Sequence, residues 1–228
     1  IHLTNGPRNQ LNYAGYGAPD LDILRDLRGR HEDSDLVILP SPSLVFGEEA
    51  YTLMDPDGNK IVFGLYSDSP EPQKTMPGRM QHVVVGSPNV ELMIDHYTKG
   101  VGFIISDIVR REDGTITSCF MRSDKEHHSF AVFLNDAVKL DHNCYETENW
   151  NDIRDWADHF SKSRITLWWG PGRHGPGDNL FFMVSDPDGN SVELSAEIEI
   201  VGADREMGTW LHEERTLNYW GKGMLRVD

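Results

Sequence analysis

Two kinds of hydrophobic pattern alternate along the chain. Short apolar segments predict β-strands, and at 190–199 the apolar residues fall on every second position, so one face of that strand is apolar and the other polar. Between the strands, apolar residues recur at i, i+3 and i+4, which predicts amphipathic helices. These helical stripes are Val90, Met93, Ile94 and Tyr97 in one segment, and Trp150, Ile153, Ala157 and Phe160 in another.

The order strand, helix and further strands is predicted three times. The first copy has strands at 10–17, 49–54 and 60–66 and a helix that starts at Pro19-Asp20. The second copy has strands at 80–86, 103–110, 116–122 and 128–134 and a helix from Ser87-Pro88 to Gly100. The third copy has strands at 139–146, 165–169, 179–185 and 190–199 and a helix at 149–161. The prolines and acidic residues of 67–77 predict a linker between the first two copies. The pattern predicts an α+β fold of repeated βαβββ units.

The first and third copies also match in sequence. The stretch from Met54 to Val62 parallels the stretch from Ser185 to Glu193, and both contain the turn sequence Asp-Pro-Asp-Gly. Upstream, Tyr13 takes the place that His142 has in the third copy. The first copy therefore has Tyr and Val where the third has His and Glu, which indicates a site in the third copy alone.

Composition limits the classes of partner. The chain of 228 residues carries 21 Lys and Arg against 37 Asp and Glu, a formal net charge of −16. Such a surface repels phosphate backbones and anionic lipid, so we expect no nucleic acid and no membrane partner. The two cysteines, Cys119 and Cys144, have neither metal nor redox spacing, and we expect a reduced, cytoplasmic environment.

Three residues on matching strands predict a metal site. His82 lies on the first strand of the second copy, His142 on the first strand of the third, and Glu193 on the last strand of the third. Two neutral imidazoles and one carboxylate hold a divalent ion on one face and leave positions open, as in non-haem Fe(II) oxygen chemistry. Taken singly, a histidine in a strand is more often a core residue, and a glutamate at this position more often faces solvent.

With these residues, a set of motifs resembles the type I extradiol ring-cleaving dioxygenases of the vicinal oxygen chelate superfamily. The motifs are Gly172-Arg-His174, the aromatic strand Leu180–Met183, Asp186-Pro-Asp-Gly189 before Glu193, and Tyr219-Trp220-Gly221. The resemblance covers about 78–221, and residues 1–66 are similar to the second half of the family's inactive N-terminal domain. It implies a partial N-terminal domain without metal ligands at 1–70, a catalytic domain at 78–200 and a packed C-terminal tail at 201–228. We expect that a segment precedes Ile1 and that the chain is a homo-oligomer.

The resemblance implies a function as well as a fold. The metal ligands would be His82, His142 and Glu193, and the metal Fe(II), with Mn(II) as an alternative. His128 would be the acid–base histidine and His174 a second catalytic, substrate-contacting one. The substrates would be a small aromatic diol and O2, both of whose atoms are inserted as the ring opens beside the hydroxyls. Strand alternation predicts that the neighbouring His127 points away from the site.

Two departures from the family pattern affect the substrate. Met183 stands where the family has a tyrosine that hydrogen-bonds a substrate oxygen, so His174 would have to orient the substrate. Family members that bind a carboxylated catechol hold its carboxylate with arginines, but the matching positions here are Trp169, Thr216 and Leu217. Trp168 and Trp169 either line an apolar pocket in place of the arginines or belong to the core, and we expect a substrate without that carboxylate.

Two other classes of function fit the same scaffold. A metal-dependent lyase, isomerase or hydrolase acting on vicinal oxygens would work without consuming O2, and the missing tyrosine keeps this alternative open. A protein that only binds a small aromatic compound would not need metal, and the complete His, His and Glu set argues against it.

Overall fold

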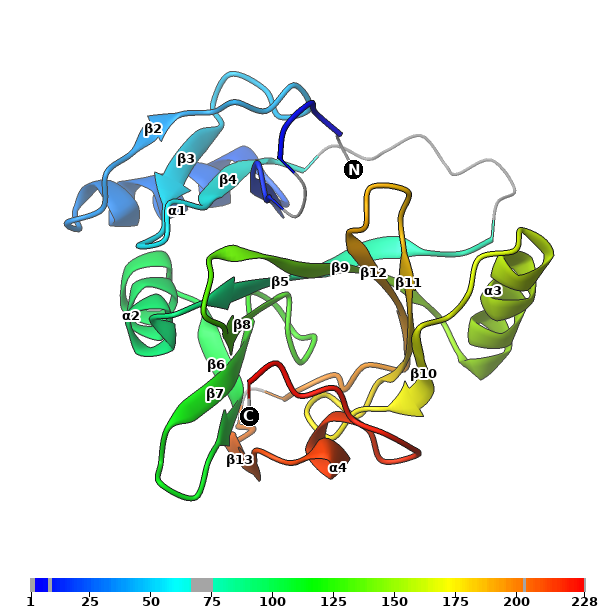
Figure 1. Cartoon of the computed structure of the whole chain (residues 1–228). Helices are drawn as coiled ribbons and strands as arrows, with labels where there is room; N and C mark the ends of the chain where they lie inside the picture. Colours follow the sequence, from blue (N-terminus) through cyan, green and yellow to red (C-terminus); the bar gives the residue numbers. More distant parts are fainter. Residues whose placement is uncertain (1–2, 8–9, 67–75, 203, 228) are drawn as a thin grey trace. The chain divides into compact units, whose positions relative to one another are not determined.

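The computed structural model describes residues 3–7, 10–66, 76–202 and 204–227, and it divides the chain into two compact units (Figure 1). Among the described residues, one unit contains 3–6, 10–66 and 92–102, and the other contains Pro7, 76–91 and the residues from Phe103 onward. The predicted linker at 67–77 lies mostly outside the described residues. None of the helices that the structure describes combines the length and apolarity that a membrane crossing requires.

The first unit has a four-stranded sheet. Its elements are β1 (Ala14–Ala18), α1 (Leu21–Glu32), β2 (Leu39–Pro40), β3 (Tyr51–Met54) and β4 (Lys60–Leu65), with the strands in the order β1-β4-β3-β2. Asp20 caps α1 by accepting a hydrogen bond from the backbone N–H of Ile23 at 2.8 Å. Residues 92–102 belong to this unit, where the hydroxyl of Tyr97 donates to the buried Asp55 carboxylate.

The second unit has a nine-stranded sheet. Its strands are β5 (Arg79–Ser87), β6 (Ile104–Arg110), β7 (Ile116–Arg122), β8 (Phe130–Leu134), β9 (Lys139–Thr147), β10 (Trp169–Arg173), β11 (Leu180–Ser185), β12 (Ser191–Ala196) and β13 (Gly208–Leu211). Their order in the sheet is β10-β11-β12-β9-β5-β8-β7-β6-β13. The sheet is strongly curved, and the chain that includes α4 (Glu214–Leu217) runs between its two ends (Figure 1).

The three predicted copies have the same topology. In each copy the first strand pairs in parallel with the last: β1 with β4, β5 with β8, and β9 with β12. The register agrees as well, because Ala14 lies opposite Ile61 in the first copy and Asn143 lies opposite Val192 in the third. The antiparallel pair β5 and β9 joins the second and third copies at the centre of the large sheet. The predicted α+β fold of repeated units is confirmed.

The helices of the second and third copies each differ from the prediction in one detail. The helix of the second copy is α2 (Val90–Asp95), continued by the π-helical turn η1 (His96–Val101), and it ends at Gly102 in the left-handed region at φ 94° rather than at Gly100. In the third copy α3 (Trp150–Lys162) buries Ile153 against β11 and β12. Trp150, at its first turn, is 43% exposed and instead contacts Trp220, which is also exposed.

The strand predicted at 165–169 lies further along the chain. β10 spans Trp169–Arg173, so Gly172 and Arg173, which lie beyond the predicted end at 169, are paired with β11. The pairing is irregular between Trp169 and Gly172, where the chain has a bulge and a cis peptide bond before Pro171. Hydrophobic periodicity missed this strand because its residues are Gly and Pro rather than apolar side chains.

Candidate metal centre

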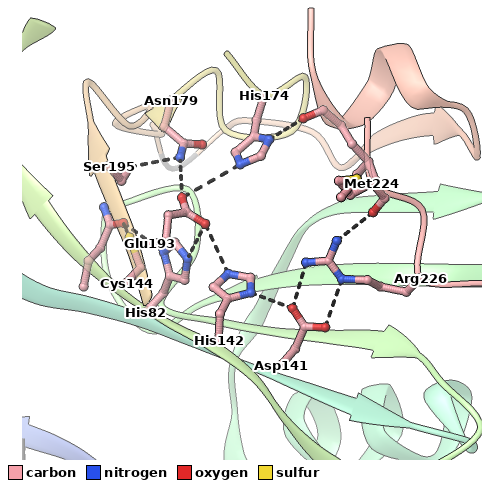
Figure 2. Close-up of polar contacts among 12 residues, drawn as sticks. His82, Asp141, His142, Cys144, His174, Asn179, Glu193, Ser195, Met224 and Arg226 are labelled. Carbon is pink, nitrogen blue, oxygen red and sulfur yellow. Dashed lines mark hydrogen bonds and ion pairs between the residues drawn. The ribbon is translucent and has the colours of Figure 1, made fainter. Parts of the chain in front are cut away.

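The centre of the candidate site is the carboxylate of Glu193. Glu193 is buried on β12, which lies beside β9, and β9 lies beside β5, so that His142 and His82 project from the two adjacent strands (Figure 2). Oε2 of Glu193 is 3.3 Å from Nε2 of His142 and 4.0 Å from Nε2 of His82. Burial raises the pKa of Glu193, but the hydrogen bond from His142 and the nearby histidines outweigh burial and lower it to about 2.

The two histidines present the same ring nitrogen to the carboxylate. Nδ1 of His82 lies 2.9 Å from the side-chain oxygen of Gln81, and Nδ1 of His142 lies 2.7 Å from Oδ1 of Asp141. Because both oxygens accept, each Nδ1 carries a hydrogen, and each Nε2 is the ring nitrogen that faces Glu193. Metal-binding histidines are held in the same way, so the donor set fits a divalent ion.

The two histidines differ in pKa because their charged neighbours differ. Burial lowers the pKa of His82 to about 3, against a smaller opposing effect of Glu193. Burial acts on His142 too, but Asp141 and Glu193 on either side of its ring raise its pKa to about 9. In the metal-free protein the ring of His142, which lies between two carboxylates, is therefore protonated. A divalent cation would replace the proton on its Nε2, which faces Glu193.

Cys144 is a further possible ligand that the sequence analysis did not include. One donor atom each from His82, Cys144 and Glu193 lie within 4.8 Å of one another. The thiol of Cys144 points toward the oxygen of Gln81 at 3.7 Å, and burial, together with the charge of Glu193, raises its pKa well above its usual value. Its position two residues after His142 on one strand was the available signal, since alternate residues share a face.

The two histidines that the resemblance assigned to catalysis lie at the same cavity. The ring of His128 is 4.4 Å from the ring of His82, measured between centroids, and burial lowers its pKa well below 6.5. His174 donates from Nδ1 to the backbone oxygen of Leu217 at 2.6 Å, and its Nε2 is 3.8 Å from Oε1 of Glu193. Its ring stacks on Phe181 with 3.7 Å between centroids, which fixes the plane of the imidazole.

His127 is not among the residues that line the cavity, but it is linked to the site through His128. His127 is fully buried, and its Nδ1 lies 3.0 Å from Nδ1 of His128. Strand alternation does not apply to this pair, because β8 begins only at Phe130 and both histidines lie before it. Consecutive residues outside a strand are free to turn their side chains toward each other.

The walls of the cavity are mostly apolar. It is lined by Val84, Phe120, Phe133, Trp169, Pro176, Met183 and Leu217, together with His82, His128, His142, His174, Glu193 and Arg226. Met183 lies directly opposite Glu193 in the β11–β12 register, and Trp169 lies opposite Met183 on β10. Thr216 and Trp168 are not among the lining residues, so of the two tryptophans only Trp169 contributes to this pocket.

Arg226 supplies an ion pair at the cavity wall that the sequence analysis missed. Its Nε and Nη2 donate to Asp141 at 3.0 and 2.9 Å, and Nη1 donates to the backbone oxygen of Met224 at 2.6 Å (Figure 2). The guanidinium also lies 5.5 Å from the ring centroids of Phe133 and Trp169. Asp141 thus connects the C-terminal segment to the histidine that faces Glu193.

Replacing Asp141 by asparagine is expected to weaken metal binding by about 10- to 100-fold. The carboxylate fixes the orientation of the His142 ring and makes its Nε2 more basic, and an amide does this poorly. Competition titration with a chromogenic chelator measures the change in affinity. Arg226→Met is the matched control, since it leaves the contact between Asp141 and His142 intact and should cost less. Unchanged affinity in Asp141→Asn would show that the carboxylate does not support the site.

Comparison with known proteins identifies the class to which this fold and site belong. Residues 79–194 match the Glyoxalase/Bleomycin resistance protein/Dioxygenase superfamily, and the chain belongs to that family. The matched range begins at the start of β5 and ends on β12, so it contains the strands of His82, His142 and Glu193.

Individual relatives place the similarity more narrowly. Metapyrocatechase 2 of Cupriavidus necator is 27% identical over 242 residues, which cover 95% of this chain and 73% of the relative. A solved structure of a homoprotocatechuate 2,3-dioxygenase variant from Brevibacterium fuscum is similar, with a TM-score of 0.81 and 20% sequence identity. The match covers 95% of this chain and 64% of that one. The Mn(II)-bound glyoxalase of Novosphingobium aromaticivorans has a TM-score of 0.72 at 24% identity, over 92% of this chain and 70% of that one. The predicted resemblance to extradiol ring-cleaving dioxygenases is confirmed. This chain spans less than two thirds of the homoprotocatechuate enzyme's length.

Proposed function

We propose that this protein is an extradiol dioxygenase that opens a catechol-type ring beside its vicinal hydroxyls with both atoms of O2. The observation that carries the proposal is the convergence of Nε2 of His82, Nε2 of His142 and the Glu193 carboxylate at one wall of a buried cavity. His128 and His174 line the same cavity, which provides groups for proton transfer next to the donor set.

His82, His142 and Glu193 would hold Fe(II), with Mn(II) as the alternative, since ligands of this type do not separate the two ions sharply. When bound, the ion would supply acidification of the catechol hydroxyls and a common site for substrate and dioxygen. We favour His142 over Cys144 as the third ligand because His142 Nε2 points at Glu193, whereas the protonated thiol of Cys144 points at Gln81.

The protein's own residues would orient the substrate and handle its protons. His128 is neutral and would accept a proton from a catechol hydroxyl and later return it to the product. His174 already uses its Nδ1 hydrogen on Leu217, so its Nε2 would accept a hydrogen bond from the substrate. Met183 offers no donor, so the polar contacts of the ring oxygens fall on the histidines. The apolar walls would exclude water from the reacting ring.

The cavity favours a substrate with an uncharged, apolar substituent. Arg226 is the single lysine or arginine among the lining residues that the structure describes, and Asp141 already pairs with its guanidinium through two hydrogen bonds. A substrate carboxylate would therefore meet the negative charge of Glu193 without a free cation to bind it. Kinetics on 3-methylcatechol, 4-methylcatechol and 3,4-dihydroxyphenylacetate should give kcat/KM at least about tenfold higher for the uncharged pair. Preference for the carboxylated compound would contradict this assignment.

The activity itself is tested by oxygen uptake. Protein loaded anaerobically with Fe(II) is offered a panel of catechols while dissolved oxygen and visible absorbance are followed together. We expect equimolar loss of catechol and oxygen and a yellow ring-opened product, neither of which appears with His142→Ala. Metal-loaded protein that consumes no oxygen with any catechol would refute the dioxygenase function.

A second candidate is a metal-dependent lyase or isomerase that does not use oxygen. Two observations favour it: methionine stands at position 183, and the fold is shared with a Mn(II)-bound glyoxalase. Turnover of a vicinal-oxygen substrate under strict anaerobiosis, without oxygen uptake on catechols, would establish this candidate instead.

A further inference from the structure

A second buried network leads away from the candidate site through His128. Asp107, on β6, is fully buried, and its carboxylate accepts hydrogen bonds from Arg205 Nη1 at 2.7 Å, from the backbone N–H of Gly208 at 3.1 Å and from Trp210 Nε1 at 2.7 Å. These donors and His127 outweigh the opposing effect of burial and lower the pKa of Asp107, so the carboxylate is ionised.

His127 lies between this carboxylate and His128. Its Nε2 is 3.1 Å from Oδ2 of Asp107, a bent contact that is the only polar contact of that nitrogen in the described part of the chain. Its Nδ1 is 3.0 Å from Nδ1 of His128. Gly177 packs closely against the same ring, since a Cβ added at this position, where φ is 80°, would lie 3.1 Å from Nδ1 of His127.

The ionised carboxylate of Asp107 determines which atom donates in each contact from Asp107 through His127 to His128. An ionised carboxylate only accepts, so when His127 carries a single ring hydrogen, that hydrogen belongs on Nε2 and its Nδ1 is an acceptor. The hydrogen between the two rings must then come from Nδ1 of His128. The reverse arrangement would place a lone pair of His127 Nε2 against the negative Asp107 carboxylate, which burial makes especially unfavourable.

We propose that Asp107 and His127 are positioning residues that hold His128 in the tautomer with hydrogen on Nδ1, leaving Nε2 unprotonated for the cavity. The catalytic part of this inference rests on the proposed function, in which Nε2 of His128 is the base. When a substrate hydroxyl transfers its proton, the O–H bond breaks and an N–H bond forms at Nε2. The imidazolium keeps its Nδ1 bond to His127, and Asp107 stabilises the positive charge through that ring until the proton is returned.

A matched pair of variants tests the inference. His127→Asn places an amide oxygen near the position of Nδ1 and keeps an acceptor for His128, whereas His127→Leu removes the acceptor. Long-range 1H–15N NMR of histidine-labelled protein, metal-free and loaded with diamagnetic Zn(II), reads the tautomer of His128, whose signals are assigned by their loss in His128→Gln. We expect the Nδ1–H form in the wild type and in His127→Asn, and the Nε2–H form to predominate in His127→Leu.

Kinetics of the Fe(II)-loaded protein give a second readout. We expect kcat to fall at least about tenfold in His127→Leu, KM to change little and His127→Asn to restore most of kcat. If the leucine variant does not fold, Asp107→Asn tests the same hydrogen-bonded network, because loss of the negative charge weakens the preference for hydrogen on His127 Nε2 and is expected to raise the share of the Nε2–H form of His128.

The outcomes separate this inference from the proposed function. Nε2–H at His128 in the wild type, or an unchanged tautomer in His127→Leu, would overturn the positioning role. The expected tautomers in a protein that cleaves no catechol would support the positioning role and refute only the dioxygenase function.

Discussion

Replacing Glu193 by glutamine is expected to abolish oxygen uptake and to lower metal affinity by more than about a hundredfold. The carboxylate is the only negatively charged member of the proposed ligand set, and it faces two histidine Nε2 atoms in a buried environment. A neutral amide of the same shape cannot balance the charge of a divalent ion there. Metal content after anaerobic loading, affinity by competition titration and oxygen uptake on a catechol measure the loss.

The same experiment distinguishes the two possible donor sets. His142→Ala should reproduce the loss seen with Glu193→Gln, whereas Cys144→Ser should retain metal and activity. Both replaced residues are buried on one face of β9, two positions apart, so general damage to the strand would affect them similarly. Retained metal in His142→Ala together with loss in Cys144→Ser would mean that Cys144 is the ligand and that the proposed set is wrong.

The sequence was sufficient for the fold because the relevant signals are local. Strand periodicity, the Asp-Pro-Asp-Gly turns and the helical stripe around Met93 each depend on a few neighbouring residues. Their repetition gave the topology, and the observed register pairs Ala14 with Ile61 just as it pairs Asn143 with Val192. The approach of His82, His142 and Glu193 to one another follows from that repetition, since all three lie on adjacent strands.

The rest of the site depends on contacts between distant parts of the chain. Arg226 reaches Asp141 across 85 residues, and Asp107 meets Trp210 across 103, distances along the sequence over which no periodicity carries information. His127 was not connected to His128 for a different reason. It was treated as part of a strand that begins three residues later, so the alternation rule was applied outside its range.

These distant contacts have a common electrostatic consequence. Asp141 and Asp107 are both buried carboxylates that each receive an arginine on one side and a histidine on the other. Each carboxylate is thereby kept ionised and acts on a histidine of the cavity, His142 directly and His128 through His127. In the proposed mechanism the two imidazoles then have different tasks: His142 would bind the metal, and His128 would take up and return the substrate's protons.

Replacing His128 by glutamine is therefore expected to lower kcat by roughly 10²- to 10⁴-fold while metal affinity remains within a few-fold of the wild type. Glutamine fills much of the space of the ring but cannot take up a proton, so binding of metal and catechol should survive while proton transfer fails. Steady-state oxygen uptake, metal content and the KM for catechol measure these quantities separately. His159→Gln, at an exposed position on α3, is the matched control and should leave all three unchanged. A His128→Gln variant with nearly normal kcat would assign the acid–base role to another group, and His174, which faces Glu193 across the same cavity, would be the next residue to replace.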